Sequence, residues 1–349
     1  MGCSGEKMEM HKGQGNEKDS ESISSDESNN LQVPVSDDVT ELEHGLSIAE
    51  YDGDYKFDTF LSNGGAKSDK DVLTFLIDSG LVNLGMNFSI PGFGCSTISV
   101  PAMDGNGYLF GRNFDWNKCN ALIMVSRPGS GYVSVSTVNT DFIKQAAGIP
   151  LTDKILKIAA LYAPLDGMNE KGLCVTVNMI QDNDTINQNT DKPDITTTTA
   201  IRLLLDNAAN VDEAIELLES YDMHASFGYM VHFAIADADG RAVAVEYIGG
   251  GMSVVETPVL TNFYVTAGDK YGIGTSQSHT RFEILESKLS DNPVMSEALV
   301  KDALSSVSKG NFGEFESTEW SIVFNQEDKT ATYYHRENYD QAYTVSLER

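Results

Sequence analysis

The sequence predicts an α+β fold with antiparallel sheets. Strand-like segments occur in blocks separated by blocks of helix-like segments, instead of alternating with them one by one as in a doubly wound parallel sheet. Short turns rich in glycine, asparagine and aspartate join successive strand-like segments, as they do in hairpins. The 349 residues, 41% of them hydrophobic, can bury a sizeable core as one large domain or two small ones.

Residues 1–48 are predicted to form a disordered acidic tether. No aromatic residue occurs from 1 to 38, where Ser, Glu, Asp, Asn and Lys dominate. A segment of this composition cannot bury enough apolar area to offset the entropy lost on ordering. The tether also carries part of the net charge of −28, so this charge says little about the substrate.

The first residues, Met-Gly-Cys-Ser-Gly, have three interpretations. Gly-Cys-Ser before a polar tether is similar to the lipid-bearing cysteine of a bacterial lipoprotein whose signal peptide has been trimmed, with Cys3 as the lipid attachment site. Myristoylation of Gly2 is disfavoured, because Glu6 stands where the motif requires Ser or Thr. The third interpretation is an ordinary disordered terminus with an idle cysteine. A lipidated Cys3 implies membrane attachment and an extracytoplasmic, cell-surface or secreted protein.

Residues 49–94 are predicted to be a helical segment that ends in an exposed loop. Apolar residues recur at helical spacing, and Gly64-Gly65 separates two short helices. Residues 90–94 read Ile-Pro-Gly-Phe-Gly, and this combination of proline and glycine favours a turn. An exposed turn is a natural place for the chain to be cut.

From residue 95 onward, apolar patterns and turn residues predict further strands and helices. The predicted strands cover 96–100, 108–116, 122–126, 132–138, 173–180, 231–236, 242–248, 259–264, 320–325, 330–335 and 341–347. The predicted helices cover 195–209, 211–220, 278–290 and 295–306, and the first of them opens with threonines suited to capping. Residues 103–107, 127–131, 166–172 and 237–240 are predicted to be turns.

Composition and missing motifs exclude several classes of function. The acidic charge argues against nucleic-acid binding, which needs clustered Lys and Arg. Four cysteines are too few for a disulfide scaffold, and no segment is long and apolar enough to span a bilayer. The sequence contains no HExxH, GxSxG or GxxxxGK[ST] motif, and its histidines lack metal-ligand spacing. We therefore expect neither a metal nor a cofactor, and a nucleophile here would need an unusual base.

Cys95, directly after Gly94, is the candidate nucleophile. A cysteine at a chain terminus supplies its own base, because its α-amine has a pKa of about 7.7–8.0. The same thiol can first attack the Gly94 carbonyl, and hydrolysis of the resulting thioester would release residues 1–94. Glycine at this position tolerates the strained backbone that the attack requires. The alternative is a buried structural cysteine, the commonest state of a free one.

Short motifs around and after Cys95 resemble the choloylglycine hydrolase family of linear amide C–N hydrolases. The opening comprises residues 95–98 (Cys-Ser-Thr-Ile), 104–107 (Asp-Gly-Asn-Gly) and 111–115 (Gly-Arg-Asn-Phe-Asp). The family includes bile-salt hydrolases and penicillin V acylases, and acid ceramidase and N-acylethanolamine acid amidase have a similar opening. Further along follow, in family order, 166–173 (Asp-Gly-Met-Asn-Glu-Lys-Gly-Leu), a strand with Asn178, 260–263 (Leu-Thr-Asn-Phe) and 278–282 (Ser-His-Thr-Arg-Phe).

The resemblance implies a four-layer αββα sandwich, the N-terminal nucleophile (Ntn) hydrolase fold, as the catalytic domain at 95–349. It also implies a role for each matched residue: Cys95 as nucleophile and base, Arg112 near the thiol, Asp115 on the α-amine, Asn178 and Asn262 at the oxyanion, and Arg281 in support. Each has an alternative. Arg112 and Asp115 would form a salt bridge along the strand, the two asparagines would be core amides, and Arg281 would be a solvated helix charge. Cys119 and Cys174 are interpreted as packing residues.

The chain departs from many bile-salt hydrolases, which lose only an initiator methionine. Here 94 residues precede Cys95, an arrangement that resembles acid ceramidase, with residues 49–94 as a helical propeptide. We therefore expect a self-processing amidase that cleaves linear, non-peptide C–N bonds of acyl amides. Fatty-acid amides such as N-acylethanolamines come first, conjugated bile salts second, and penicillin V or acyl-homoserine lactones third. The hypothesis of another class is a non-catalytic, surface-tethered binding protein. The sequence leaves open whether the chain forms a homo-oligomer with further copies of itself.

Overall fold

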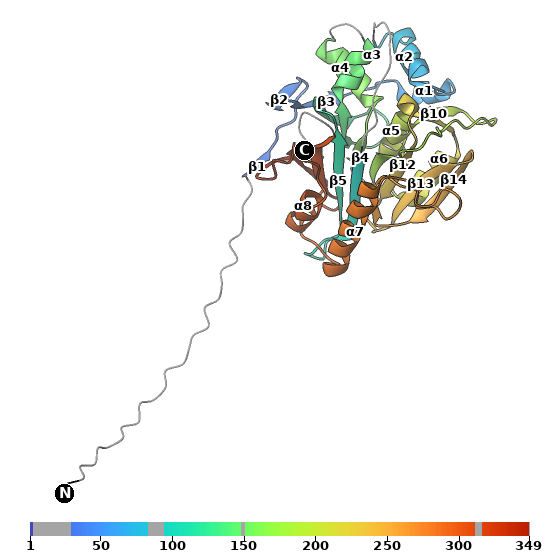
Figure 1. Cartoon of the computed structure of the whole chain (residues 1–349). Coiled ribbons are helices and arrows are strands. Elements are labelled where there is room, and N and C mark those ends of the chain that lie inside the picture. Colours follow the sequence, from blue (N-terminus) through green and yellow to red (C-terminus); the bar gives the residue numbers. More distant parts are fainter. Residues whose placement is uncertain (3–28, 83–93, 148–150, 311–315, 349) are drawn as a thin grey trace.

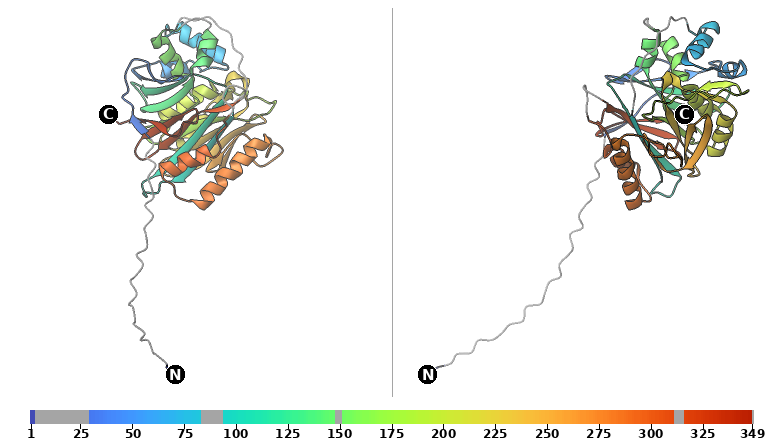
Figure 2. Two further views of the ribbon diagram at one scale, coloured as in Figure 1. Left: turned by 60° about the vertical axis from the view of Figure 1, so that its left-hand side comes forward. Right: turned by 45° about the vertical axis from the view of Figure 1, so that its right-hand side comes forward.

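Two large β-sheets stacked face to face dominate the computed structural model, which describes residues 1–2, 29–82, 94–147, 151–310 and 316–348 (Figure 1). Helices α4 (Asp153–Leu161), α5 (Thr197–Asn207) and α6 (Val211–Glu219) pack against one sheet, while α7 (Ser276–Asp291) and α8 (Glu297–Ser305) pack against the other. Figure 2 shows α7 and α8, in orange, on the side of the sheets opposite to the green and blue helices. The predicted four-layer αββα sandwich is confirmed.

The first sheet carries the strand that begins at the candidate nucleophile. Within the described residues it has seven strands, in the order β1-β18-β17-β16-β5-β4-β15. All its pairs are antiparallel except β1 with β18. The strands are β1 (Asn29–Gln32), β18 (Gln341–Ser346), β17 (Thr330–His335), β16 (Ser317–Asn325), β5 (Tyr108–Trp116), β4 (Gly94–Pro101) and β15 (Val259–Leu260).

The second sheet has nine strands within the described residues, in the order β14-β13-β12-β9-β8-β7-β6-β3-β2. Only β3 and β6 are parallel to each other. The strands are β14 (Gly251–Glu256), β13 (Ala242–Ile248), β12 (Val231–Ala236), β9 (Cys174–Met179), β8 (Asp166–Asn169), β7 (Ser134–Asn139), β6 (Ala121–Arg127), β3 (Leu46–Asp52) and β2 (Thr40–Glu43). A small parallel pair, β10 (Asp194–Thr196) and β11 (Asp222–His224), lies outside both sheets.

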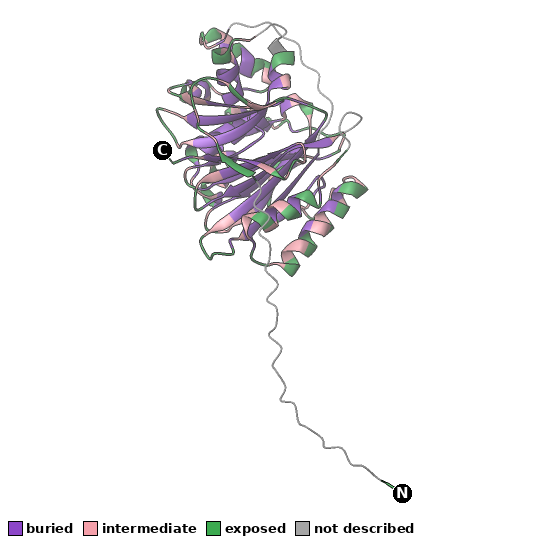
Figure 3. Cartoon of the chain, turned by 90° about the vertical axis from the view of Figure 1, so that its left-hand side faces the viewer, coloured by how far each residue is buried: buried purple, intermediate pink, exposed green. Residues whose placement is uncertain are grey.

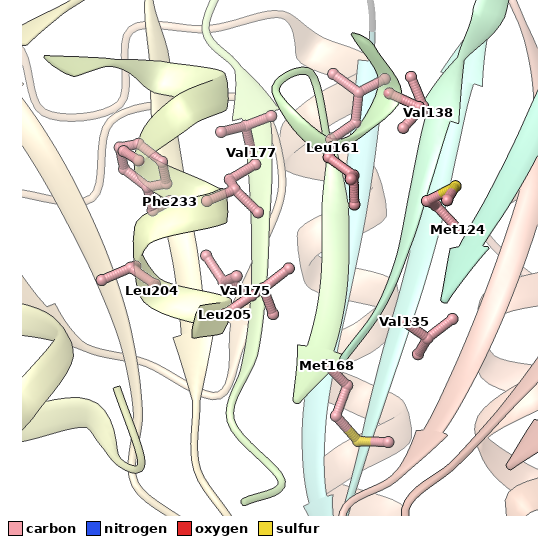
Figure 4. Packing of buried hydrophobic residues seen from close by; sticks show 14 of the residues in the cluster. Met124, Val135, Val138, Leu161, Met168, Val175, Val177, Leu204, Leu205 and Phe233 are labelled. Carbon is pink, nitrogen blue, oxygen red and sulfur yellow. The ribbon is translucent and has the colours of Figure 1, made fainter. Parts of the chain in front are cut away.

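Apolar side chains fill the spaces between all four layers. The larger cluster occupies the space between the sheets and the space under α4, α5 and α6; Figure 4 shows Leu204, Leu205 and Phe233 in it. A second cluster joins β4 and β5 to α7 and α8. In Figure 3 the strands are mainly buried, whereas α7 and α8 also present exposed residues. Burial on both faces explains why several strands read as apolar runs without alternation.

The sequence located most of the elements from residue 95 onward. The bounds of β5, β12, β13 and β17 match the predicted strands. The capping threonines of α5 are confirmed, because the Thr196 side chain accepts a hydrogen bond from the Thr199 N–H in a capping box. Six elements were not predicted: α3 (Thr140–Ala147), α4, the strands β10, β11 and β14, and the short 3-10 helix η1 (Ser226–Gly228). The predicted strand at 259–264 ends at Leu260, and the predicted turn at 166–172 begins with strand β8.

The prediction of a disordered tether is wrong for residues 29–48. Strand β1 pairs with β18, and β2 and the start of β3 form the edge of the nine-stranded sheet. All four residues of β1 are exposed, so backbone hydrogen bonds hold this strand and no apolar pattern is needed. Leu46 and Ile48 of β3 are buried in the core. Cys3 and the rest of 3–28 lie outside the described residues, so lipid attachment stays a prediction.

The segment 49–82 is tightly packed against the rest of the chain. Its two predicted helices are confirmed as α1 (Phe57–Ser62) and α2 (Asp69–Asp78), while strand β3 was not predicted. The Tyr162 ring, just after α4, lies 5.5 Å from Phe57 and 5.6 Å from Phe60 between ring centroids. The segment therefore contributes both a strand and an aromatic cluster to the core. The predicted loop before Gly94 falls mostly at 83–93, outside the described residues.

None of the helices in the described part of the chain is long and apolar enough to cross a membrane.

Candidate active site

The β4–β5 hairpin places Cys95 and Arg112 on the same face of the seven-stranded sheet. Its register pairs Cys95 with Phe114, and Thr97 with Arg112. Because alternate residues of a strand face the same way, both functional side chains point to one side. That side faces the nine-stranded sheet, since the Arg112 guanidinium reaches strand β9. The nucleophile candidate thus lies between the two sheets.

The Cys95 thiol is fully buried in the uncleaved chain. Its Sγ lies 3.5 Å from the carbonyl oxygen of Val177. Burial raises the pKa of Cys95 to about 11, against a lowering by the nearby Arg112 guanidinium and a further raising by Asp115. The thiol is therefore protonated at neutral pH in this state, and it needs a base to become a nucleophile.

Arg112 connects the thiol to the facing sheet. Its Nε donates to Asp166 Oδ2 at 3.2 Å, its Nη1 to Asn178 Oδ1 at 2.7 Å, and its Nη2 to the Val177 carbonyl at 3.1 Å. The side chain is fully buried. Burial alone would lower the pKa of this guanidinium, but Cys95 and Asp166 raise it overall. A cation is thus held permanently beside the sulfur.

Arg281, from α7, reaches the opposite face of β4. Its Nη1 donates to the Cys95 carbonyl at 2.7 Å, to Ser96 Oγ at 2.6 Å and to Asp115 Oδ2 at 3.2 Å. Its Nη2 donates to Asn262 Oδ1 at 2.6 Å. One guanidinium therefore links the backbone of the candidate nucleophile to a carboxylate and to an amide.

Charged groups surround the Gly94 position. Asp115, which pairs with Gly94 in the strand register, accepts from Thr318 Oγ1 at 2.7 Å. A β-carbon added to Gly94 would lie 2.9 Å from Lys309 Nζ and 3.2 Å from both Asp115 Oδ2 and Glu316 Oε2. The lack of a side chain lets these three groups approach the Gly94–Cys95 bond. The Asp115 carboxylate therefore lies beside the residue that precedes Cys95.

The two asparagines approach the site from different elements. Asn262 Oδ1 accepts from the Cys95 backbone N–H at 2.9 Å, and its Nδ2 donates to the Met179 carbonyl at 2.6 Å. Asn178 Nδ2 points to the Leu260 carbonyl at 3.4 Å. In the uncleaved chain both amide donors are thus directed at backbone carbonyls near the thiol.

The structure brings all six predicted site residues into one connected network. The alternative of a strand salt bridge between Arg112 and Asp115 is wrong, because the two side chains face opposite sides of the sheet and pair with Asp166 and Arg281. Arg281 is buried, so it is not a solvated helix charge. Asn178 and Asn262 are buried, hydrogen-bonded amides, which agrees with the alternative interpretation. Asn178 also accepts from Arg112, and Asn262 also accepts from the Cys95 N–H. Cys119 and Cys174 are free and buried.

The sequence interpretation missed several residues that hold this network. Asp166 was placed in a turn, but it accepts from Arg112 and from Trp320 Nε1 at 3.0 Å. Thr318 and Lys309 contact Asp115 from near the end of the chain. The only sequence signal was that Asp166 begins the motif at 166–173. Within the described ranges, no group of three or more His, Cys, Asp or Glu side chains is placed to hold a metal ion.

A comparison with known families identifies the relationship. A family model described as "Acyl-coenzyme A:6-aminopenicillanic acid acyl-transferase" matches residues 155–340, more than half of the chain. The chain belongs to this family. The match also supports the resemblance to the choloylglycine hydrolases. This support is independent of Cys95, because the matched residues begin after it. No curated protein matches the sequence.

Solved structures share the fold of this acyl-transferase family member. Penicillin V acylase from Agrobacterium tumefaciens is 21% identical with a TM-score of 0.50, and the match covers 69% of this chain and 83% of that one. Two variants of the conjugated bile acid hydrolase from Clostridium perfringens are 17% and 16% identical, with TM-scores of 0.54 and 0.55. Each of these matches covers 72% of this chain and 92% of the other. These likenesses establish the Ntn-hydrolase fold.

Proposed function

We propose that the protein is a self-processing cysteine amidase that hydrolyses linear acyl amides after the chain is cut before Cys95. The observation that carries the proposal is the buried network that joins Arg112, Asp115, Asn178, Asn262 and Arg281 around this residue. A non-catalytic binding protein has no need of one buried guanidinium beside the thiol and a second on the backbone of the same residue, because burying charge is costly even when it is paired.

Self-cleavage begins with attack of Cys95 Sγ on the Gly94 carbonyl carbon. The bond from this carbon to the Cys95 nitrogen breaks, and the nitrogen takes up the thiol proton and becomes a free amine. Water then hydrolyses the Gly94 thioester, which releases the Gly94 carboxylate and regenerates the thiol. Arg112 favours the thiolate form through its charge, and Asn262 holds the nitrogen that leaves.

Amide hydrolysis repeats this chemistry on a substrate. The α-amine of Cys95 takes the thiol proton, the thiolate attacks the acyl carbon, and the amine returns the proton to the departing substrate nitrogen. Water hydrolyses the acyl thioester and releases the acid. Asp115 orients the α-amine, while the amide donors of Asn178 and Asn262 turn from their backbone partners to the oxyanion. No metal or redox partner is needed to balance these steps.

The substrate proposed first is an amide with an apolar acyl group, such as a fatty-acid amide. An aromatic series leads away from the thiol: Phe114 and Trp116 lie 6.3 Å apart between ring centroids, Trp116 and Phe142 5.1 Å, and Phe142 and Phe227 5.1 Å. Phe114, Trp116 and Phe142 are buried in the uncleaved chain, and an apolar lining of this kind suits an acyl chain. The solved structures with this fold favour conjugated bile acids and penicillin V as the alternatives.

The test combines mass analysis with a hydrolysis panel. Wild-type protein should show the mass of a chain cut before residue 95, and it should hydrolyse at least one of a fatty-acid amide, a conjugated bile acid or penicillin V. Cys95→Ala should remain uncut and inactive. Cys174→Ala is the matched control, since it also removes a fully buried thiol but lies outside the network, and it should mature and react normally. An intact wild-type chain that hydrolyses none of the three amides would instead support the binding-protein hypothesis.

A further inference from the structure

Three side chains on neighbouring strands form a buried polar row behind the active site. Asn178 on β9 pairs with His232 on β12, and Glu246 on β13 lies opposite His232, one residue beyond the Phe233–Val245 pair. All three row members are fully buried. They face the seven-stranded sheet, because Asn178 contacts Arg112 there. The row is therefore continuous with the candidate site, although no hydrogen bond or ion pair among the described residues joins His232 or Glu246 to Cys95.

The His232 ring is directed at two acceptors. Its Nδ1 lies 2.9 Å from Glu246 Oε1, and its Nε2 lies 2.8 Å from the carbonyl oxygen of Thr261. A backbone carbonyl only accepts hydrogen bonds, and so does an ionised carboxylate. To donate to both of these acceptors, the ring needs a proton on each nitrogen. The partners of Glu246 hold its pKa below the usual range against the raising effect of burial, which keeps the carboxylate ionised.

His232 and Glu246 form hydrogen bonds with the backbone on both sides of Asn262. Strand β15 ends at Leu260, so the sheet does not continue to fix the backbone beyond that residue. His232 holds the Thr261 carbonyl, while Glu246 accepts from the Val265 N–H at 2.9 Å and the Thr266 N–H at 2.8 Å. The segment is also bridged at Phe263 to Gly274. These contacts hold the backbone on both sides of Asn262, while Arg281 and the Met179 carbonyl hold its side chain where the oxygen accepts from the Cys95 N–H.

We infer that His232, as an imidazolium held by Glu246, is a positioning residue that fixes Asn262 against Cys95. The inference rests on the proposed amidase function for its kinetic consequence, and on geometry alone for its structural one. A side chain that cannot donate from both ends loosens the Thr261 carbonyl or leaves the buried Glu246 carboxylate without its cation. Because a misplacement of about 1 Å can cost about 10²-fold in rate, the loss should fall on kcat.

The first experiment needs no activity. Histidine labelled with ¹⁵N in the uncleaved Cys95→Ala protein should show His232 with both ring nitrogens protonated at pH 7.5. Hydrogen exchange of the residue-95 amide, which donates to Asn262, should be faster when His232→Gln is added. His224→Gln is the matched control, because His224 is a buried histidine paired with Asp194, away from the network. A neutral His232 ring, or equal exchange rates in both variants, would overturn the inference.

The second experiment measures kinetics on the matured enzyme. His232→Gln should lower kcat by about 10²-fold with KM changed by less than about threefold, while His224→Gln should keep kcat. The double variant His232→Gln with Glu246→Gln should lose less than the product of the two single losses, because the two groups act as one unit. Equal kcat in His232→Gln and wild type would refute the positioning role. An inactive wild type would refute the proposed amidase instead, and the ring and exchange measurements would then decide the geometry alone.

Discussion

Tyr162 offers a sharp test of whether residues 29–94 remain bound once the chain is cut. Its ring is 1% exposed and lies among Phe57, Phe60 and Phe75, and its hydroxyl donates to the Tyr55 carbonyl at 2.8 Å. These four partners all precede the proposed cut, whereas Tyr162 follows it. Contacts within one chain would thus become contacts between two. We predict that the N-terminal fragment stays bound and that Tyr162→Ala weakens its binding.

The size of the effect follows from the burial of the ring. Replacing a large buried aromatic residue by alanine costs about 3–5 kcal/mol, and about 1.4 kcal/mol corresponds to a tenfold change in affinity. The dissociation constant of the fragment should therefore rise by about two to three and a half orders of magnitude. Tyr162→Phe keeps the ring and removes only the hydrogen bond to Tyr55, which costs about 1 kcal/mol or about fivefold.

The assay follows release of the fragment from matured enzyme. The C-terminal chain is immobilised after cleavage is verified by intact mass, and the fragment in the wash is measured over time. Wild type should retain it, Tyr162→Phe should release it slightly faster, and Tyr162→Ala should release it much faster. Immediate release from wild type would show that the packing does not hold two chains together. Indistinguishable release from all three proteins would show that the Tyr162 cluster carries none of the binding energy.

Three further predictions concern the site and its surroundings. Gly94→Ala should slow self-cleavage about tenfold in a mass time course, because its β-carbon would meet Lys309 and Asp115; unchanged kinetics would contradict this crowding. Asp166→Asn should lower kcat about 10²-fold, because Arg112 loses its buried carboxylate partner, and a kcat equal to wild type would exclude this role. Burial lowers the pKa of His335 from 6.5 to about 4 although Glu43 Oε1 lies 3.4 Å away, so this histidine is neutral in the folded state. The free energy of unfolding should therefore keep the contribution of this neutral histidine above pH 6.5. It should fall by about 3 kcal/mol as the pH falls toward 4, as measured by denaturant titrations. His335→Gln should flatten this acid loss, and an unchanged slope would assign the loss to other groups.

The candidate site was largely predictable because its residues stand in short motifs. The hairpin that joins Cys95 to Arg112 is local, so its turn and its alternation can be read along the chain. Asp166 and the His232–Glu246 pair were not found, because their roles depend on contacts that only the folded chain makes. Asp166 binds Arg112 from the facing sheet, and His232 binds Glu246 on the neighbouring strand and the Thr261 carbonyl. Asp166 is followed by a glycine, a pair that is typical of a hairpin turn, so the sequence did not indicate that this aspartate is buried.

The N-terminal segment shows the opposite case. Its polar composition predicts disorder, and residues 29–48 nevertheless form strands because two sheet edges offer them unpaired backbone groups. The composition of a segment indicates how much apolar area it can bury. It does not indicate whether a sheet edge has free backbone groups with which the segment can pair.

The sequence by itself determined the fold class and pointed to Cys95 as the nucleophile candidate, since periodicity and short motifs are local properties of the chain. Its resemblance to the choloylglycine hydrolases added the five residues proposed to act with Cys95. Only the tertiary structure decided how the charges pair. Arg112 and Asp115 are three residues apart, and a salt bridge between them was the alternative to their roles in the site. Strand alternation turns the two side chains to opposite faces, where Arg112 pairs with Asp166 and Asp115 pairs with Arg281. It also decided that the first part of the chain is built into both sheets, because hydrogen bonds between strands connect residues without regard to their separation in sequence.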